Sequence, residues 1–228
     1  MERTIEYKIS GRRALFTDPV SKIGGEKFSY PVPTYQALKG ITESIYWKPT
    51  IIWYIDSVRV IKPIRHESQN VRPLKYEKNE NELSIYSYLS DVEYQVTAHF
   101  EWNFNREDHA QDRNENKHLS SALRYVKKGG LRDIFLGTRE CQGYVEPCSF
   151  GEGEGAYDNS KDMPFGLMFH GFDYPDETGK DIFAARFWSA IMSNGIIRFP
   201  EPKDCTVRRI INENMKPRKI QTNTQEEF

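Results

Sequence analysis

Cysteine is scarce in this sequence, and its few copies are poorly placed for cross-linking. The 228 residues include three cysteines, Cys141, Cys148 and Cys205, an odd number without C-x-x-C spacing. Such a set supports neither a disulfide framework nor a zinc knuckle. We therefore expect three reduced thiols and a cytoplasmic protein.

Long apolar runs are also missing. The longest uniformly apolar stretch is residues 51–55, far shorter than the ~20 residues that cross a bilayer as a helix. Residues 1–4 lead into polar sequence without the apolar region of a secretory leader. These absences predict a cytoplasmic location and no membrane partner.

An excess of charge of either sign is absent as well, since the formal net charge at pH 7 is −1. Bulk charge therefore does not indicate a nucleic-acid partner, which would require basic residues gathered on one surface. The hydrophobic share of 38% and the charged share of 29% are typical of a globular protein with a core.

What the sequence does contain is a helix with an unusual first turn. Leu119, Ala122, Leu123 and Val126 recur at helical spacing, and Asn114 is a suitable N-cap, which predicts a helix to Lys128. Lys117 and His118 then lie in the first turn, where the helix dipole already disfavours cations. A bound phosphate would relieve this conflict. An ordinary amphipathic helix with a solvated start remains the alternative.

The other predicted elements follow a recognisable order. Strands are expected at residues 4–9, 51–64, 83–88, 92–104 and 134–136, and a second helix at 34–46, capped by Thr34 and ended by Pro49. Strand, helix, strand, strand, helix, strand is the ferredoxin-like order. In that fold, Tyr46 at the end of the first helix lies beside Lys117 and His118 at the start of the second.

The remaining segments predict a loop and a second unit. Residues 11–33 are rich in glycine and proline, and this expected loop carries Lys22 and Lys27, which could clamp a phosphate backbone. From residue 148 the composition shifts, with strand-like segments at 165–172, 182–188, 195–199 and 206–211. We expect an α+β protein with one domain at 1–147, a small β-rich domain at 148–220 and a frayed tail at 221–228.

Three other patterns are weaker. The Gly-Glu-Gly-Glu-Gly stretch at 151–155 lacks phosphate-loop spacing and carries two acidic residues, so it is rejected as a nucleotide site. Asp108, His109 and Asp112 could bind a metal but are more simply solvated. His99, on the polar face of the 92–104 strand, could touch a ligand or be merely exposed. No metal site or cofactor is predicted.

Several motifs in one order resemble a known family across nearly the whole chain. They are residues 16–19 (FTDP), 28–40 (FSYPVPTYQALKG), 53–56 (WYID), 116–118 (NKH) and 135–141 (FLGTREC). Together they resemble the CRISPR-associated Cas subunit five of the d subtype, a RAMP-type protein of type I-C systems. The resemblance implies a modified ferredoxin-like (RRM-like) N-terminal domain and metal-independent cleavage of precursor CRISPR RNA at its repeat hairpin.

The same resemblance implies partners and site residues. The product would stay bound by its 5′ handle, together with other subunits of a type I-C Cascade complex. The matching catalytic positions are Tyr46, Lys117 and His118. As RNA contacts we select basic residues expected to be exposed: Lys22, Lys27, Arg124, Lys128 and Arg139.

These residue types fit metal-free RNA cleavage. The ribose 2′-hydroxyl is the nucleophile, so the site needs a proton acceptor and a positive group for the phosphorane. His118 is the candidate acid or base, Lys117 would stabilise phosphate charge, and Tyr46 would orient the hydroxyl or share in proton transfer. A non-catalytic subunit that caps the 5′ handle and a generic RNA-binding scaffold remain alternatives.

Overall fold

The computed structural model describes residues 3–19, 26–75, 80–81 and 83–217. In the first part of the chain the elements are β1 (Thr4–Ala14), β2 (Lys27–Phe28), α1 (Tyr35–Ile45), β3 (Ile51–Val60), β4 (His66–Val71), β5 (Leu74–Lys75), β6 (Glu80–Asn81) and β7 (Ser84–Trp102). The chain continues through the 3₁₀ helix η2 (Glu107–Asp112), α2 (Glu115–Lys127), β8 (Ile134–Phe135) and β9 (Gln142–Pro147). Its last elements are β10 (Met163–Asp173), α3 (Pro175–Thr178), β11 (Phe183–Ser193), β12 (Ile196–Arg198), the 3₁₀ helix η3 (Pro202–Asp204) and β13 (Val207–Asn212).

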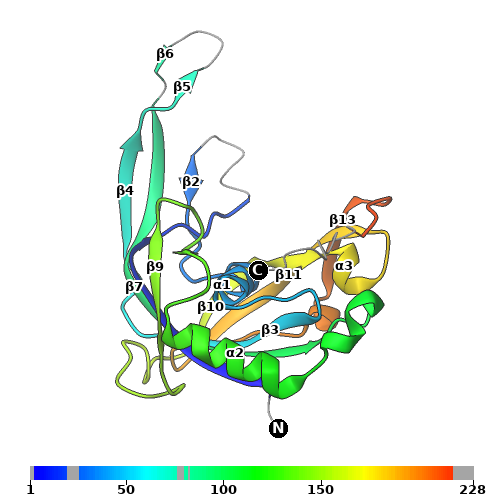
Figure 1. The fold of residues 1–228 in the computed structure, drawn as a ribbon. Helices are drawn as coiled ribbons and strands as arrows, with labels where there is room; N and C mark the ends of the chain where they lie inside the picture. Colours follow the sequence, from blue (N-terminus) through cyan, green and yellow to red (C-terminus); the bar gives the residue numbers. More distant parts are fainter. Residues whose placement is uncertain (1–2, 20–25, 76–79, 82, 218–228) are drawn as a thin grey trace.

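Most strands join one curled sheet in the order β10-β11-β12-β3-β7-β1-β9-β8, with β13 on β11 and with β2 and β4 on β7. The α1 helix is seen end-on near the centre of Figure 1, inside the curl, and α2 lies across the front. The expected α+β class is confirmed, as a mostly β fold with few helices. In the described part of the chain, no helix has the length and apolar character needed to cross a membrane.

The core forms where the inward faces of the central strands meet the two long helices. The fully buried side chains include Tyr7 on β1, Trp53 on β3, Phe100 on β7 and Leu38 on α1. The alternation predicted for 92–104 holds from Val92 to Phe100, where every second residue is buried. This apolar face fixes the strand register, because a shift of one residue would turn it to solvent.

Both predicted helices begin at the predicted caps. The Thr34 hydroxyl accepts a hydrogen bond from the Ala37 backbone N–H at 3.2 Å, and the Asn114 side chain accepts one from the Lys117 N–H at 3.1 Å. Leu123 departs from the expected buried stripe of α2 and is 43% exposed. His118 takes a buried place instead, with none of its surface exposed.

Strand β7 corrects two predictions. The strands expected at 83–88 and 92–104 are one strand, which bends at Asp91, where φ is +50°. Its first half pairs with β4 and extends from the body as an arm (Figure 1). It ends at Trp102, so Phe104 lies outside it and is 68% exposed.

Strand β4 is an element that the sequence does not predict. Both faces of β4 are largely solvated, so hydrophobic alternation is absent, and the strand exists because β7 supplies hydrogen-bond partners from Ser84 to Leu89. The predicted 11–33 loop also begins too early, since β1 continues to Ala14 opposite Leu89. Gly11 makes this possible, because a Cβ there would lie 2.5 Å from Leu136 Cδ1.

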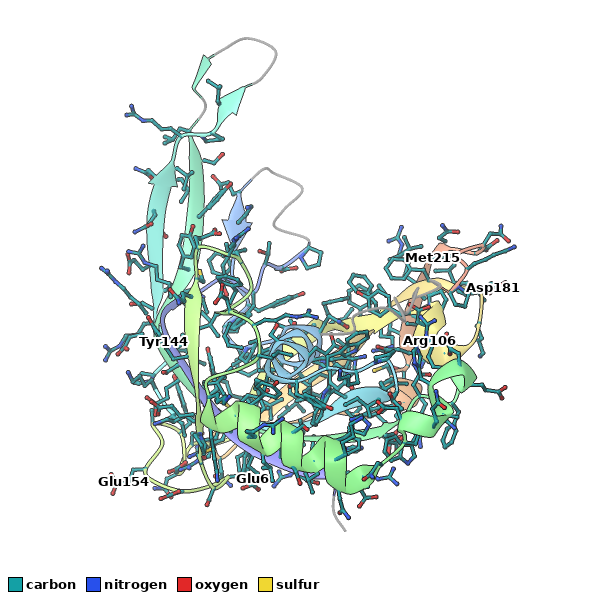
Figure 2. The ribbon with its side chains drawn as sticks, in the orientation of Figure 1. Glu6, Arg106, Tyr144, Glu154, Asp181 and Met215 are labelled. Carbon is teal, nitrogen blue, oxygen red and sulfur yellow. The ribbon has the colours of Figure 1, made fainter. Side chains whose placement is uncertain are left out.

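The C-terminal strands continue the sheet of the N-terminal ones. β12 pairs with β3 through Ile196–Arg59, Ile197–Val58 and Arg198–Ser57. The loop after β9 folds back under the sheet, where the Phe150 N–H donates to a carboxylate oxygen of Glu6 at 2.9 Å. Glu6 and Glu154 mark this region at the lower edge of Figure 2. The expected boundary at 147/148 stays a prediction.

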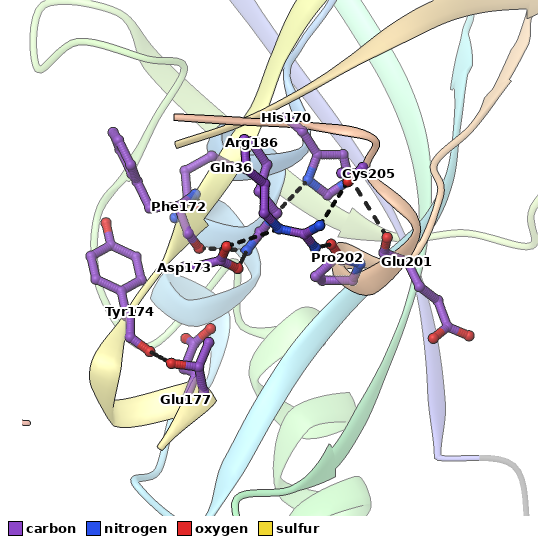
Figure 3. Close-up of polar contacts among 12 residues, drawn as sticks. Gln36, His170, Phe172, Asp173, Tyr174, Glu177, Arg186, Glu201, Pro202 and Cys205 are labelled. Atoms are coloured by element: carbon purple, nitrogen blue, oxygen red, sulfur yellow. Dashed lines mark hydrogen bonds and ion pairs between the residues drawn. The ribbon is translucent and has the colours of Figure 1, made fainter. Parts of the chain in front are cut away.

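A buried polar cluster joins β10 and β11 to the start of α1 (Figure 3). We call it the His170 cluster and define it as Tyr35, Gln36, His170, Asp173 and Arg186. Arg186 Nη1 donates to the Phe172 carbonyl at 2.8 Å and also contacts the Asp173 carboxylate. The Gln36 side-chain oxygen accepts from the Phe172 N–H at 3.1 Å, and the His170 ring stacks on Tyr35 with centroids 4.1 Å apart. These contacts fasten the C-terminal strands to α1.

Candidate active site

The end of α1 and the start of α2 meet over the sheet. Tyr46 is the C-cap of α1, and its backbone N–H still donates to Thr42 at 3.0 Å. His118 lies in the first turn of α2, and its Nδ1 is 2.8 Å from the Tyr46 hydroxyl. The expected proximity of these two residues is therefore confirmed, while their role in catalysis stays a prediction.

Both ring nitrogens of His118 are engaged. Nε2 lies 2.8 Å from the Asp112 backbone carbonyl, which can only accept, so Nε2 carries a proton. In the neutral ring Nδ1 is then an acceptor, and the Tyr46 hydroxyl donates to it. Phe100 and Trp102 meet the ring at centroid distances of 6.2 and 5.6 Å and close the remaining sides.

Lys117 is ion-paired to the Asp112 carboxylate, whose other oxygen accepts a hydrogen bond from the Thr50 hydroxyl at 3.0 Å. Burial alone would raise the pKa of Asp112, but Lys117 and Thr50 outweigh it and hold that pKa below its usual value. The same pair raises the pKa of Lys117. A side chain of the protein thus relieves the conflict between Lys117 and the helix dipole, without a bound anion.

Tyr46 is a phenol rather than a phenolate in this setting. Burial raises its pKa above the ordinary value, although Ser121 and the charge of Lys117 act in the opposite direction. A phenol of this kind cannot serve as a free anionic base near neutral pH. It can pass a proton on, because it is hydrogen-bonded to the acceptor nitrogen of His118.

Access to the three residues is unequal. His118 is fully buried and Tyr46 is 3% exposed, whereas the Lys117 side chain is 51% exposed. A phosphate approaching from solvent therefore meets Lys117 first. Tyr125 covers the phenol by stacking on it, with ring centroids 6.0 Å apart.

The predicted RNA contacts fall in several places. Arg124 is exposed and lies over the Tyr125 ring at 5.4 Å, which puts it close to the site. Lys128, the exposed C-cap of α2, is at the far end of that helix. Lys27 lies on β2 against Tyr86 of the arm at 4.6 Å, and Arg139 is exposed between β8 and β9. Lys22 is outside the described residues.

The weaker sequence patterns have local partners. Arg59 donates to the Glu152 and Gly153 carbonyls at 3.0 and 2.8 Å, so the 151–155 stretch covers part of the sheet. His99 Nδ1 is 2.8 Å from an Asp56 carboxylate oxygen, which raises the pKa of His99. Within the described ranges no three His, Cys, Asp or Glu side chains gather closely enough to hold a metal ion.

Sequence reasoning missed Asp112 as part of the site, having considered it only for a metal. It lies outside the periodicity of α2, and the only available signal was an acidic residue just before a helix that starts with two cations. Ser121 and Tyr125 were also missed. Both lie on α2 beyond its first turn, and they became visible as neighbours of Tyr46 only once the two helices were packed.

Comparison with known proteins extends this picture. Two crystal structures cover 91% of this chain and 97% of their own: one titled as a CRISPR-associated protein, with a TM-score of 0.78 and 39% identity, and a functionally uncharacterized protein from Streptococcus mutans, with 0.72 and 40%.

Two curated relatives carry the name CRISPR pre-crRNA endoribonuclease Cas5d. The relative from Mannheimia succiniciproducens is 28% identical over 88% of this chain and 96% of its own length. The relative from Thermus thermophilus is 29% identical over 77% of this chain and 76% of its own. The family model for Cas5d, described as CRISPR-associated protein (Cas_Cas5), matches residues 4–200. The chain therefore belongs to the Cas5d family of CRISPR-associated proteins.

Proposed function

We propose that this protein is an endoribonuclease that cuts precursor CRISPR RNA at the repeat hairpin by metal-independent attack of a 2′-hydroxyl. The names of the two curated relatives support the substrate and the reaction class. The observation that carries the mechanism is the 2.8 Å contact between the Tyr46 hydroxyl and His118 Nδ1, beside the exposed ammonium of Lys117.

The reaction forms one bond and breaks another at phosphorus. The ribose 2′-oxygen attacks the phosphate, the bond to the 5′-oxygen breaks, and a 2′,3′-cyclic phosphate results. The proton of the 2′-hydroxyl passes to the Tyr46 oxygen while the phenol proton moves to His118 Nδ1. The leaving 5′-oxygen takes a proton from Lys117 or from water.

Lys117 supplies the positive charge for the phosphorane. Because it is half-exposed and ion-paired to Asp112, it can exchange that carboxylate for the RNA phosphate. A positive group at this point stabilises charge that develops in the transition state. Arg124, which lies over Tyr125, is a further proposed RNA contact beside the site. Lys27, Lys128 and Arg139 would extend the contact surface.

The proposal includes the assembly and the architecture. The product remains bound by its 5′ handle within a type I-C Cascade complex. The strand order β9-β1-β7-β3, in which every neighbouring pair is antiparallel, supports a modified ferredoxin-like arrangement of residues 1–147. The proposed smaller β-rich domain at 148–220 is described up to residue 217, and the predicted tail at 221–228 lies outside the described residues.

The test is to incubate purified protein with its own repeat RNA in EDTA, beside RNA with a single 2′-deoxy substitution at the scissile nucleotide. We expect a 2′,3′-cyclic phosphate end on the natural RNA and no cutting of the substituted one. Cutting of the 2′-deoxy RNA, or an absolute need for a divalent ion, would contradict the mechanism.

One observation favours a second candidate, a non-catalytic subunit that caps the 5′ handle. His118 and Tyr46 are almost closed to solvent, as in a centre with a purely structural role. This candidate predicts tight binding of mature handle RNA and no cutting of the repeat by the wild-type chain.

A further inference from the structure

Asp112 contacts both Lys117 and His118 of the candidate active site. Its backbone carbonyl accepts from His118 Nε2 at 2.8 Å, and its carboxylate oxygen Oδ2 lies 3.5 Å from the same nitrogen. The other oxygen, Oδ1, contacts the Lys117 ammonium. Asp112 is thus the carboxylate that links Lys117 and His118.

The carboxylate is held in place by a third element. Thr50, just before β3, donates its hydroxyl to Asp112 Oδ2 at 3.0 Å, and Asp112 itself ends η2. Residues from the β3 side, from η2 and from α2 therefore converge on one side chain. That side chain is only 28% exposed, so its geometry is constrained in a way that a surface aspartate is not.

We propose that Asp112 is a positioning residue that holds Lys117 in the free protein and supports His118 once RNA has taken Lys117. The inference rests on the proposed function. A phosphate that pairs with Lys117 releases Oδ1, and the carboxylate then becomes a full hydrogen-bond acceptor for the Nε2 proton of His118. A carboxylate in that position keeps the ring in the required tautomer and stabilises the imidazolium that forms.

Among the described residues around His118, no second carboxylate contacts the ring. Tyr46 faces it from the end of α1, Phe100 and Trp102 face it from β7, and Lys117 precedes it on α2. Arg3 lies over the outer side of the Trp102 ring at 4.9 Å and is paired to Glu115 at 2.9 Å. Glu115 is therefore already engaged, and Asp112 is the acidic group in contact with the ring.

The experiment compares Asp112→Asn with Asp108→Asn. Both changes remove one negative charge from η2, but Asp108 contacts His109 at 3.4 Å rather than the site. The asparagine at 112 keeps the backbone carbonyl that accepts from His118 and removes only the carboxylate. Binding is measured with 2′-deoxy repeat RNA, which the proposed mechanism cannot cut, and the single-turnover rate with natural RNA.

We expect Asp112→Asn to change RNA affinity and the cutting rate in opposite directions. For Asp112→Asn, RNA binding tightens about two- to fivefold, because a surface-type ion pair no longer competes for Lys117. The cutting rate falls about 10- to 100-fold, a part of what general acid–base catalysis contributes. A merely structural role would weaken both. Asp108→Asn changes neither by more than about twofold, as expected for an exposed charge.

Every other outcome contradicts either this inference or the proposed function. An Asp112→Asn protein that cuts at the wild-type rate, or binds RNA no tighter than Asp108→Asn, overturns the inference and leaves the proposed function standing. A wild-type protein that binds but does not cut overturns the proposed function, and the positioning role with it. If Asp112→Asn does not fold, Thr50→Val tests the role instead: it must slow cutting at unchanged affinity, and an unchanged rate overturns the inference.

Discussion

The molecule contains two fully buried histidines, and they differ instructively. His118 and His170 each have no exposed surface, and each lies beside a tyrosine from one end of α1: Tyr46 after its last residue and Tyr35 at its first. Each also has an aspartate paired to a cation close by, Asp112–Lys117 in one case and Asp173–Arg186 in the other.

The two centres are connected differently to solvent. At His170 the cation is the buried Arg186, and the Tyr35 ring stacks on the imidazole while its hydroxyl makes no well-formed hydrogen bond among the described residues. At His118 the cation is half-exposed and the tyrosine hydroxyl is bonded to the ring. This difference is the reason why we propose chemistry at His118 and not at His170.

The two histidines also differ in the charged groups that face them. Burial and the charge of Arg186 lower the pKa of His170 to about 3, so this ring stays neutral at physiological pH. The His170 cluster holds β10 and β11 to α1 through hydrogen bonds and ring stacking. His118 faces a carboxylate instead of a guanidinium.

The largest expected effect comes from replacing each histidine by asparagine. We expect His118→Asn to lower the cutting rate about 10³-fold, the scale of lost general acid–base catalysis, with RNA binding retained. His170→Asn should leave the rate of the folded protein unchanged and lower its stability by about 1–3 kcal/mol through unpaired buried groups. Single-turnover cleavage and urea unfolding measure the two effects, and loss of cutting in a folded His170→Asn protein would refute the distinction.

Replacing the two tyrosines by phenylalanine tests the same difference, with a smaller expected effect. Tyr46→Phe removes the hydroxyl bonded to His118 and should slow cutting about 10²-fold. Tyr35→Phe removes a buried hydroxyl without a well-formed partner, so stability should stay equal or rise by up to about 1 kcal/mol, at an unchanged cutting rate. Thermal melting and cleavage assays of both variants check this, and equal losses of activity would contradict it.

The pH dependence of stability provides a third test. The pKa of His170 is about 3 in the folded protein against an ordinary 6.5, so between these values the unfolded chain binds a proton that the folded protein does not. Stability contributed by this residue is present above pH 6.5 and is lost as the pH falls toward 3, by about 1.4 kcal/mol per pH unit. Urea unfolding at pH 6 and pH 4.5 should show a shallower dependence for His170→Asn, and identical slopes would argue against a neutral His170.

The sequence contained local signals for the helices and only partial ones for the strands. Thr34 and Asn114 mark helix starts through side chains that bond three residues away, so a linear pattern reveals them. β4 depends on a partner strand and carries no apolar face, so no local pattern could find it.

The residues of the candidate site could likewise be predicted only in part. Tyr46, Lys117 and His118 were identified through motifs and the expected helix packing, whereas Asp112 joins them through a backbone carbonyl at the end of η2, a contact that no residue spacing encodes. His170, by contrast, drew no attention as a sequence feature, because its significance is set by Arg186 and Tyr35 from other elements.

Strand β7 has a consequence for how relatives can vary. One continuous strand forms both the arm and the centre of the body, so the residues shown on each face of the arm are counted from the body outward. Since side chains alternate along a strand, a single residue inserted or deleted on β7 between Tyr88 and the body would turn Tyr86 and Tyr88 to the opposite face. Relatives that keep the same arm surface should therefore differ in this part of β7 by an even number of residues.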